Sequence, residues 1–209
     1  MSPRQYRLGR REASVEQTRE RILQAARSLF SEAGFHAASL DQVAARADVA
    51  RATVYHHFSS KLGLLDALMY DTQERAGMNR LARIEDEQPT GAAALRAGIR
   101  EHCRCWAREH ILFRNLIGLA AVDPEARKVI EHHDERWRAG IEQFVQRLAR
   151  DGSLQPDYTL QQATAVIHLL LSFETFDRLH ARSGLSVQAV ADTLTHLASA
   201  VITPDEPPT

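Results

Sequence analysis

The sequence predicts an all-α protein made of a small N-terminal part and a larger C-terminal part. Apolar residues recur three and four positions apart along most of the chain, which is the spacing of one face of a helix. No segment alternates apolar and polar residues as a half-buried strand does. Glycine and proline fall between the periodic segments, as at Gly34 and Pro89. The 209 residues are enough for one large domain or two modest ones.

The first expected helix covers residues 18–33. Its apolar face consists of Ile22, Ala26, Leu29, Phe30 and Ala33. Gly34 follows directly, and glycine readily adopts the left-handed conformation in which many helices end. The helix is therefore expected to end there.

Two short helices are expected between Ser39 and Lys61. Ser39 can cap the first, because its hydroxyl can accept a hydrogen bond from a free backbone N–H. The apolar stripe of this helix consists of Leu40, Val43, Ala44 and Ala47. Residues 48–50 interrupt the pattern, and a second helix fits from residue 51 to near 58, with Val49, Val54 and Phe58 as its buried side. Such a pair predicts a helix-turn-helix, whose second helix enters the major groove of DNA.

The other side of the second helix carries residues suited to DNA, namely Arg51, Ala52, Thr53, Tyr55 and His56. Arg51 can form two parallel hydrogen bonds to guanine, and Thr53 can bond a base or a phosphate. Ala52 is small enough to let the backbone approach the groove. The alternative is a pair of short helices in an ordinary helical core. That reading does not explain an aromatic and cationic cluster on the exposed side.

Another helix is expected to start at residues 59–61 and to continue to about Arg83. Its inner side consists of Leu62, Leu65, Leu68 and Met69. Lys61 falls in the first turn, where a cation and the helix dipole can together hold a DNA phosphate.

These motifs resemble the DNA-binding domain of TetR-type transcriptional regulators over residues 18–68. The matching segments are RILQAA at 21–26, LFSEAGF at 29–35, TVYHHF at 53–58 and SK at 60–61. The resemblance implies a homodimer with N-terminal DNA-binding heads and a helical body that binds an effector, usually a repressor. The implied recognition contacts are Arg51, Thr53, Tyr55 and His56. The implied phosphate contacts or supports are Ser39, His57 and Lys61.

Two residues depart from the pattern of the family. Asp48 stands where glycine is common in the turn, and Ala50 stands where a capping Ser or Thr is common. Asp tolerates the left-handed conformation better than most residues, so we expect the turn to form. The missing cap is expected to lower the stability of the second helix by about 1 kcal/mol.

Charge is distributed unevenly along the chain, although the net charge is only −1. Residues 1–65 hold ten Lys and Arg against six Asp and Glu, and the other 144 hold sixteen against twenty-one. A basic head on an acidic body suits DNA binding at one end. The arginines Arg4, Arg7, Arg10 and Arg11 lie in an expected flexible arm. This arm either contacts phosphates or a minor groove, or is a solubilising tail.

The composition predicts a soluble cytoplasmic protein that associates with DNA and has no membrane partner. No stretch approaches 18 consecutive apolar residues, and the N-terminus lacks the apolar region of a signal peptide. The two cysteines are too few for a disulfide framework. No cofactor is expected.

Beyond residue 66 the chain is punctuated as a series of helices. Residues 89–91 separate two of them, and Asp123 with Pro124 opens a long helix that ends near Arg150. A further helix is expected from about residue 160 to Arg182, and Ser186 caps the last. The expected organisation is a basic arm at 1–14, a helix-turn-helix domain at 15–65, a helical ligand-binding and dimerisation domain at 66–203, and a disordered tail at 204–209.

The last two long helices carry more apolar surface than one stripe. With few helices left to cover it, we predict a homodimer joined by four helices, two from each subunit. The predicted interface is Ala163, Val166, Leu170, Phe173, Val187, Val190, Leu194, Leu197 and Val201. The alternative is that one subunit's own core covers these faces.

A small, mostly apolar effector is predicted to bind within the body. The candidate lining is Trp106, Phe113, Leu116, Trp137, Phe144, Ile167, His168, Leu171 and Phe176. Each of these could instead be an ordinary core residue. His168 is interpreted as a hydrogen-bonded core histidine, with a ligand contact as the alternative.

Three other functions were considered. His102, Cys103 and Cys105 suggest a metal or redox sensor, but the two cysteines are two positions apart on a helix and point in nearly opposite directions, so no metal site is predicted. No phosphate loop, nucleophile elbow or catalytic triad indicates an enzyme. The sequence therefore predicts a ligand-responsive repressor of a palindromic operator, with a constitutive repressor that lacks an effector cavity as the alternative.

Overall fold

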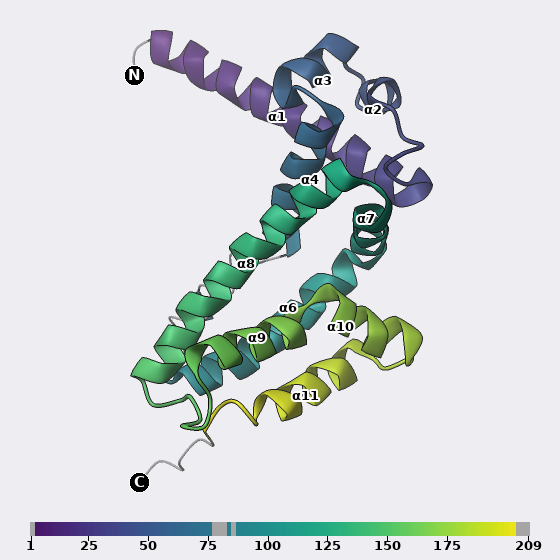
Figure 1. Cartoon of the computed structure of the whole chain (residues 1–209). Coiled ribbons are helices and arrows are strands. Elements are labelled where there is room, and N and C mark those ends of the chain that lie inside the picture. The colour runs from purple at the N-terminus through teal and green to yellow at the C-terminus, as the bar shows by residue number, and fades with distance from the viewer. Residues whose placement is uncertain (1–2, 77–82, 85–86, 204–209) are drawn as a thin grey trace. The chain divides into compact units, whose positions relative to one another are not determined.

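The computed structural model describes residues 3–76, 83–84 and 87–203, and nearly all of its regular structure is helical (Figure 1). Within those ranges there is no strand, and one isolated β-bridge joins Leu154 to Ile202. The predicted all-α class is confirmed. The chain divides into an N-terminal unit, Met1–Asp71 with Asn115–Ile130, and a C-terminal unit, Thr72–Arg114 with Glu131–Thr209. The segment 115–130 thus groups with the head, whereas the sequence analysis assigned it to the body.

The N-terminal unit starts with four helices, α1 (Pro3–Ala33), α2 (Leu40–Arg46), α3 (Arg51–Phe58) and α4 (Lys61–Ala76). Most residues of the apolar stripes predicted for them are buried in one core, but Ala33 is exposed, and Val49 and Leu62 are half-buried. Its most deeply buried members are Ile22, Leu23, Ala26, Phe30, Val43, Val54, Leu64, Leu65 and Leu68. Gly34 ends α1 with φ +80°, as predicted, and its N–H donates to the Phe30 carbonyl over 3.1 Å.

The start of α1 differs from the prediction. Residues 3–14, expected as a flexible arm, form the first turns of this helix. A proline is favourable in the first turn of a helix, and Pro3 is the first residue of α1. The next proline along the chain is Pro89, and Arg, Gln, Leu and Glu, which fill much of the segment, are good helix formers.

The segment 115–130 comprises the end of α7 (His110–Val122) and the start of α8 (Pro124–Arg150). It contacts the end of α1, because Asn115 Nδ2 donates to the carbonyls of Phe30 and Ser31 over 3.1 Å each. The predicted cap of α8 is confirmed. Asp123 Oδ1 accepts from the backbone N–H groups of Glu125 at 2.9 Å and Ala126 at 3.0 Å.

The C-terminal unit is built on α6 (Gly91–Arg108), α9 (Leu160–Leu171), α10 (Phe173–Asp177), a π-helical turn η1 (Arg178–Arg182) and α11 (Val187–Ala198). Helices α6, α9 and α11 pack against one another (Figure 1). Thr90, Thr159 and Ser186 cap α6, α9 and α11 through their hydroxyls. The predicted capping role of Ser186 is therefore confirmed.

The helix predicted from residue 160 to Arg182 is interrupted at Ser172. This residue has extended backbone angles (φ −66°, ψ 151°) and caps α10, with its Oγ accepting from the Thr175 N–H over 3.2 Å. A serine side chain can replace a helical backbone hydrogen bond in this way, and the periodicity of the apolar residues does not reveal it. The carbonyls at the end of α9 are consequently free to accept other donors.

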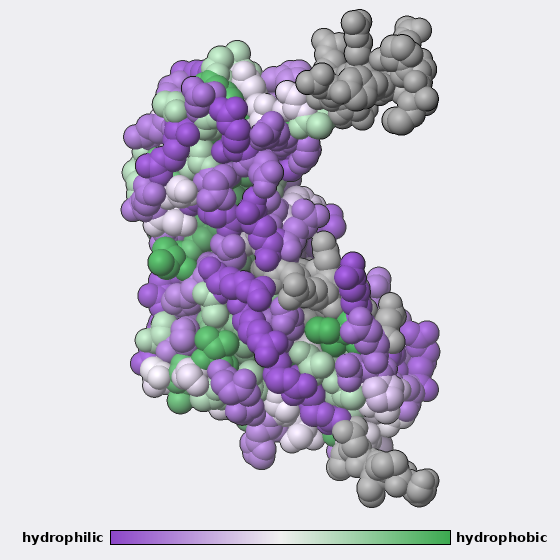
Figure 2. Space-filling view, turned by 180° about the vertical axis from the view of Figure 1, so that it is seen from behind, coloured by the Kyte–Doolittle hydropathy of each residue, from purple (hydrophilic) through white to green (hydrophobic). Residues whose placement is uncertain are grey.

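Helix α4 ends at Ala76 within the part of the chain that is described, and the predicted continuation over residues 77–82 lies outside it, as does the predicted disordered tail 204–209. No described helix is both long and apolar enough to cross a lipid bilayer. Figure 2 shows one face of the molecule, on which hydrophilic residues predominate and hydrophobic ones form small separate groups.

Candidate nucleic-acid interface and ligand cavity

The turn between α2 and α3 has the predicted left-handed residue. Asp48 has φ +52°, and it therefore occupies the position that glycine commonly fills. Arg21 from α1 supports this turn, because its guanidinium donates to the carbonyl of Asp48 over 2.8 Å and also to the carbonyl of Ala47. The turn thus gains a hydrogen-bonded support that is independent of the residue type at position 48.

The two helices of the motif differ in their N-terminal caps. Ser39 and Gln42 form a reciprocal capping box at the start of α2, with Ser39 Oγ accepting from the Gln42 N–H and the Gln42 side chain accepting from the Ser39 N–H. Ala50 precedes α3 without any side-chain hydrogen bond, as predicted. Helix α3 is instead retained by the burial of Val54 and Phe58 against the core.

Arg51 is held on the surface of the motif by two neighbours. Its guanidinium donates to Asp41 Oδ2 at 3.0 Å and to the Tyr55 hydroxyl at 3.2 Å, and it lies over the Tyr55 ring at 5.4 Å from the centroid. All three side chains are exposed. The Tyr55 hydrogen bond and the Asp41 charge raise the pKa of Arg51 above its ordinary value, so the guanidinium remains charged.

The other candidate contacts on α3 vary in exposure. Ala52 and His56 are exposed, whereas Thr53 and His57 are half-buried. Burial, assisted by the neighbouring His56 and Arg19, lowers the pKa of His57 below its ordinary value. A neutral imidazole can still donate one hydrogen bond, but it adds no charge to a phosphate contact.

Lys61 starts α4 and is positioned by residues that follow α1. Its ammonium lies 4.3 Å from the centroid of the Phe35 ring and donates to the His36 carbonyl over 3.4 Å. Partial burial lowers its pKa, against the opposing effect of Asp123. Ser39 is exposed at the start of α2, so two of the three residues predicted to contact or support phosphates, Ser39 and Lys61, lie at helix N-termini. Backbone N–H groups at such ends are suited to binding anions.

The C-terminal unit contains a cavity of about 290 Å³. This volume is at the small end of the range for ligand sites, about 300–1,000 Å³. Its described lining consists of Ile84, Ala94, Leu95, Gly98, Ile99, His102, Trp137, Gly140, Ile141, Gln143, Phe144, Ile167 and Leu171. Of the residues predicted to line an effector pocket, Trp137, Phe144, Ile167 and Leu171 do so.

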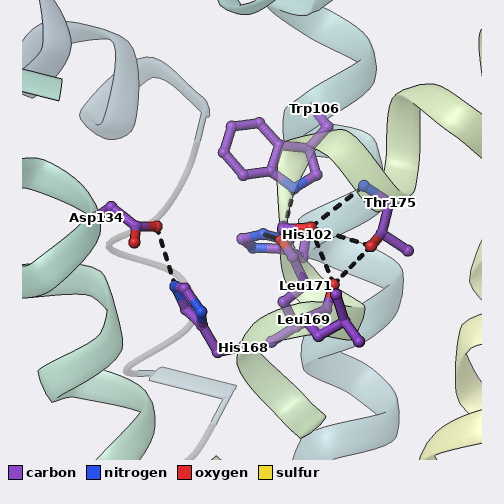
Figure 3. A network of polar contacts seen from close by, with 8 residues as sticks. His102, Trp106, Asp134, His168, Leu169, Leu171 and Thr175 are labelled. Atoms are coloured by element: carbon purple, nitrogen blue, oxygen red, sulfur yellow. Dashed lines mark hydrogen bonds and ion pairs between the residues drawn. The ribbon is translucent and has the colours of Figure 1, made fainter. Parts of the chain in front are cut away.

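Five predicted pocket residues lie elsewhere. Trp106 and Phe113 pack edge-to-face at 4.5 Å between ring centroids, and Phe176 is fully buried in the core. Leu116 belongs to the N-terminal unit. His168 is half-buried and pairs with Asp134 Oδ1 over 3.0 Å (Figure 3). Residues of one helical face are equally suited to a core and to a cavity, so periodicity could not separate these sets.

The central polar residue of the cavity is His102, which the sequence analysis considered only as part of a metal cluster. Its Nε2 lies 2.6 Å from the carbonyl oxygen of Leu171, which also accepts from Trp106 Nε1 at 3.0 Å (Figure 3). Its ring stacks on Trp137 with 4.9 Å between centroids and 12° between planes. Complete burial lowers the pKa of His102 to about 4, although its hydrogen bond to Leu171 acts in the opposite direction.

The cysteines beside His102 do not form part of this polar arrangement. Both Cys103 and Cys105 are buried, and neither forms a disulfide bond. Burial raises the pKa of Cys103 to about 12, so its thiol is neutral at pH 7 and is a poor metal ligand or nucleophile. Within the described ranges, no three side chains of the His, Cys, Asp or Glu type come together as metal ligands.

Most of the predicted dimer residues are buried within the single chain. Those with at most 9% of their surface exposed are Ala163, Leu170, Phe173, Val190, Leu194 and Val201. A residue that is already buried loses little further surface when a second chain binds. These six are core residues of the single chain, and their part in a dimer interface stays a prediction. Leu197 remains 49% exposed, and Val166 and Val187 are half-buried. Leu169, which the sequence analysis omitted, is 63% exposed.

Comparison with known proteins supports the interpretation of the N-terminal unit. Residues 22–68 match the model of the family described as bacterial regulatory proteins, tetR family. The HTH-type transcriptional regulator UidR of Escherichia coli K12 is 45% identical over 75 residues, which cover 36% of this chain and 36% of UidR. The similarity to curated relatives such as UidR thus spans about a third of their length.

Solved structures share the fold over most of the chain. FadR of Bacillus subtilis, solved in complex with stearoyl-CoA, has a TM-score of 0.69 at 20% identity and covers 86% of this chain and 96% of its own. The ketosteroid transcriptional regulator KstR2 of Mycobacterium tuberculosis has a TM-score of 0.60 at 18% identity. The match covers 90% of this chain and 95% of KstR2. At 18–20% identity these similarities show the fold alone, so they do not identify a ligand for this chain.

Proposed function

We propose that this chain, whose residues 22–68 match the tetR family of bacterial regulatory proteins, belongs to that family and is a ligand-responsive transcriptional regulator. It binds a palindromic operator as a homodimer, acts as a repressor, and is released when a small, mostly apolar effector binds in the C-terminal unit. The observation that carries the DNA-binding role is the α2–α3 pair, in which α2 is capped by Ser39 and α3 exposes Arg51, Tyr55 and His56. The relatives found are named as transcriptional regulators, which favours a regulator over an enzyme.

Two groups of residues support distinct contacts with DNA. Arg51 and Thr53 lie on α3, the helix that reads base edges in this kind of motif. Ser39 and Lys61 lie at the N-termini of α2 and α4, where contacts to phosphates fix the orientation of the protein on the duplex. Base contacts decide which sequence is bound, and phosphate contacts add affinity for every sequence.

The effector role is supported by the cavity of about 290 Å³ in the C-terminal unit. A constitutive repressor with a filled core would not need this space. Dimerisation is supported by the exposed apolar surface that remains on α9 and α11, at Leu169 and Leu197. Exposed apolar residues mark protein–protein contacts where they form a contiguous patch.

The DNA-binding role is tested by footprinting on the DNA upstream of the chain's own gene, followed by titration of the protected duplex and a scrambled duplex. We expect Lys61→Ala to weaken binding to both duplexes by a similar factor and to reduce the salt slope by about one unit, because one phosphate contact is lost. Lys128→Ala is the matched control, since Lys128 is exposed and paired with Glu125 over 2.7 Å. It should bind both duplexes as the wild type does. Unchanged affinity and salt slope in Lys61→Ala would exclude the phosphate contact.

A further inference from the structure

Two polar atoms on residues that line the cavity of the C-terminal unit are buried without a partner. They are His102 Nδ1 and Trp137 Nε1, and neither has a hydrogen bond to any part of the chain that the structure describes. A buried polar group without a partner costs about 1–3 kcal/mol, so such atoms in a ligand-sized cavity indicate what a ligand supplies. We propose that this cavity binds a neutral, mostly apolar alcohol or phenol, whose hydroxyl donates to His102 Nδ1 and accepts from Trp137 Nε1–H. The inference deepens the proposed effector role and rests on it.

The contact with Leu171 determines which nitrogen of His102 carries the proton. A backbone carbonyl can only accept, so Nε2, 2.6 Å from the Leu171 oxygen, must be the protonated nitrogen. The carbonyl is available for this contact because α9 ends at Leu171. Since burial keeps the imidazole neutral at pH 7, Nδ1 presents a lone pair and needs a donor from the ligand.

Trp137 has the complementary requirement. An indole nitrogen can only donate, so Nε1–H needs an acceptor. The rings of His102 and Trp137 stack nearly parallel, with 4.9 Å between their centroids, and both residues line the same cavity. A hydroxyl group offers one donor and two acceptor lone pairs, and it therefore meets both requirements. An ether, a ketone or a hydrocarbon leaves His102 Nδ1 without a donor.

The rest of the lining selects against charge. Leu95, Ile99, Ile141 and Phe144 are among the aliphatic and aromatic residues that form most of the wall. None of the described lining residues is Lys, Arg, Asp or Glu. A carboxylate in this site would lose its hydration without gaining a counter-ion, and it would also oppose the lone pair of His102. The ligand is therefore expected to be uncharged at its buried end.

The proposal is tested by isothermal titration calorimetry of the full chain at pH 7 with four probes of similar size. These are 2-naphthol, 2-methoxynaphthalene, naphthalene and 2-naphthoate, which provide a hydroxyl, an ether, no polar group and an anion. We expect 2-naphthol to bind about tenfold or more tightly than the ether and the hydrocarbon, in line with about 1.4 kcal/mol for a tenfold ratio. The naphthoate should bind most weakly. If 2-naphthol does not bind, or binds within about twofold of its methyl ether, the proposal is wrong.

Two variants assign the preference to the proposed atoms. His102→Phe retains an aromatic ring beside Trp137 and removes the acceptor, so it should bind naphthalene as the wild type does and lose the preference for 2-naphthol. His168→Phe is the matched control, because His168 pairs with Asp134 and is not part of the cavity lining. It should retain the preference. Trp137→Phe removes the donor together with one ring of the indole. It should reduce the preference in part, and it serves if His102→Phe does not fold.

Calorimetry without DNA separates this inference from the proposed function. DNA binding by the ligand-free chain together with equal affinity for all four probes would leave a regulator and overturn the hydroxyl preference. Preferential binding of 2-naphthol without release of the operator would support the hydroxyl contact and overturn the effector role. A hydroxyl preference that His102→Phe retains would also overturn the assignment, because the preference would then arise elsewhere.

Discussion

The polar residues of the helix-turn-helix and those of the cavity are arranged in opposite ways. Arg51, Asp41 and Tyr55 are exposed and bonded to one another. His102 Nδ1 and Trp137 Nε1 are buried and lack partners within the described chain. Exposed polar groups can exchange their partners for water or DNA at little cost, whereas buried ones cannot. The exposed groups of the motif are therefore able to exchange their mutual contacts for contacts to DNA, while the buried groups limit the chemistry of a ligand in the cavity.

The largest effect expected from this difference is a pH dependence of stability caused by His102. Its pKa is about 4 in the folded chain and ordinarily 6.5. Between these values the unfolded chain takes up a proton that the folded chain does not. The contribution of neutral, buried His102 to the free energy of unfolding is therefore fully present above pH 6.5. It decreases as the pH is lowered, by about 3 kcal/mol near pH 4.

Urea unfolding of wild type and His102→Phe at pH 7 and pH 4 measures this effect. Carboxylates titrate in both proteins, so the difference between the two proteins isolates the histidine. Between pH 7 and pH 4, we expect the free energy of unfolding of His102→Phe to decrease by about 3 kcal/mol less than that of the wild type. If both proteins lost the same free energy of unfolding, His102 would not be buried as a neutral group. The difference between the exposed polar residues of the motif and the buried ones of the cavity would then not hold.

An intermediate effect is expected for Arg51 on the surface. Arg51→Ala should reduce the discrimination between operator and scrambled duplex by about 1–3 kcal/mol, because a contact to base edges is lost. Asp41→Ala should reduce it less, since Arg51 keeps its contact with Tyr55. Arg46→Ala is the control, because Arg46 pairs with Glu32 over 2.8 Å. Competition binding assays give the ratio of the affinities for operator and scrambled duplex. A similar loss of discrimination in Arg46→Ala would contradict a specific role of Arg51.

The smallest effect is expected for the missing cap of α3. Ala50→Ser should stabilise this helix by about 1 kcal/mol, because its hydroxyl can accept from a free N–H of the first turn. Amide hydrogen exchange within α3 measures this directly. Ala52→Ser makes the same change inside the helix, where no cap can form, and should not increase protection. Equal protection in both variants would mean that the cap does not limit the order of α3.

The local features of the N-terminal unit could be predicted because each depends on a few neighbouring residues. Ser39, Asp48 and Ala50 follow rules for caps and turns that need no knowledge of the rest of the fold. The break at Ser172 and the contact of His102 with Leu171 could not be predicted in this way. These last two residues are 69 positions apart, and only packing brings them together.

The dimer residues illustrate a second limit of sequence analysis. Val190 and Leu194 were predicted to face another subunit, and both are covered within the single chain. An apolar stripe indicates that a helix face is buried, but it does not indicate whether another helix of the same chain or a second copy covers it. For α11 the cover includes α6 and α9.

The interruption at Ser172 has a consequence for how the ligand preference could change during evolution. A substitution that let α9 continue through this position would return the Leu171 carbonyl to the hydrogen-bond ladder of the helix. His102 would then be free to carry its proton on Nδ1 and to face the cavity as a donor. The site would come to favour a ketone or an ether, although no residue in contact with the ligand had been replaced.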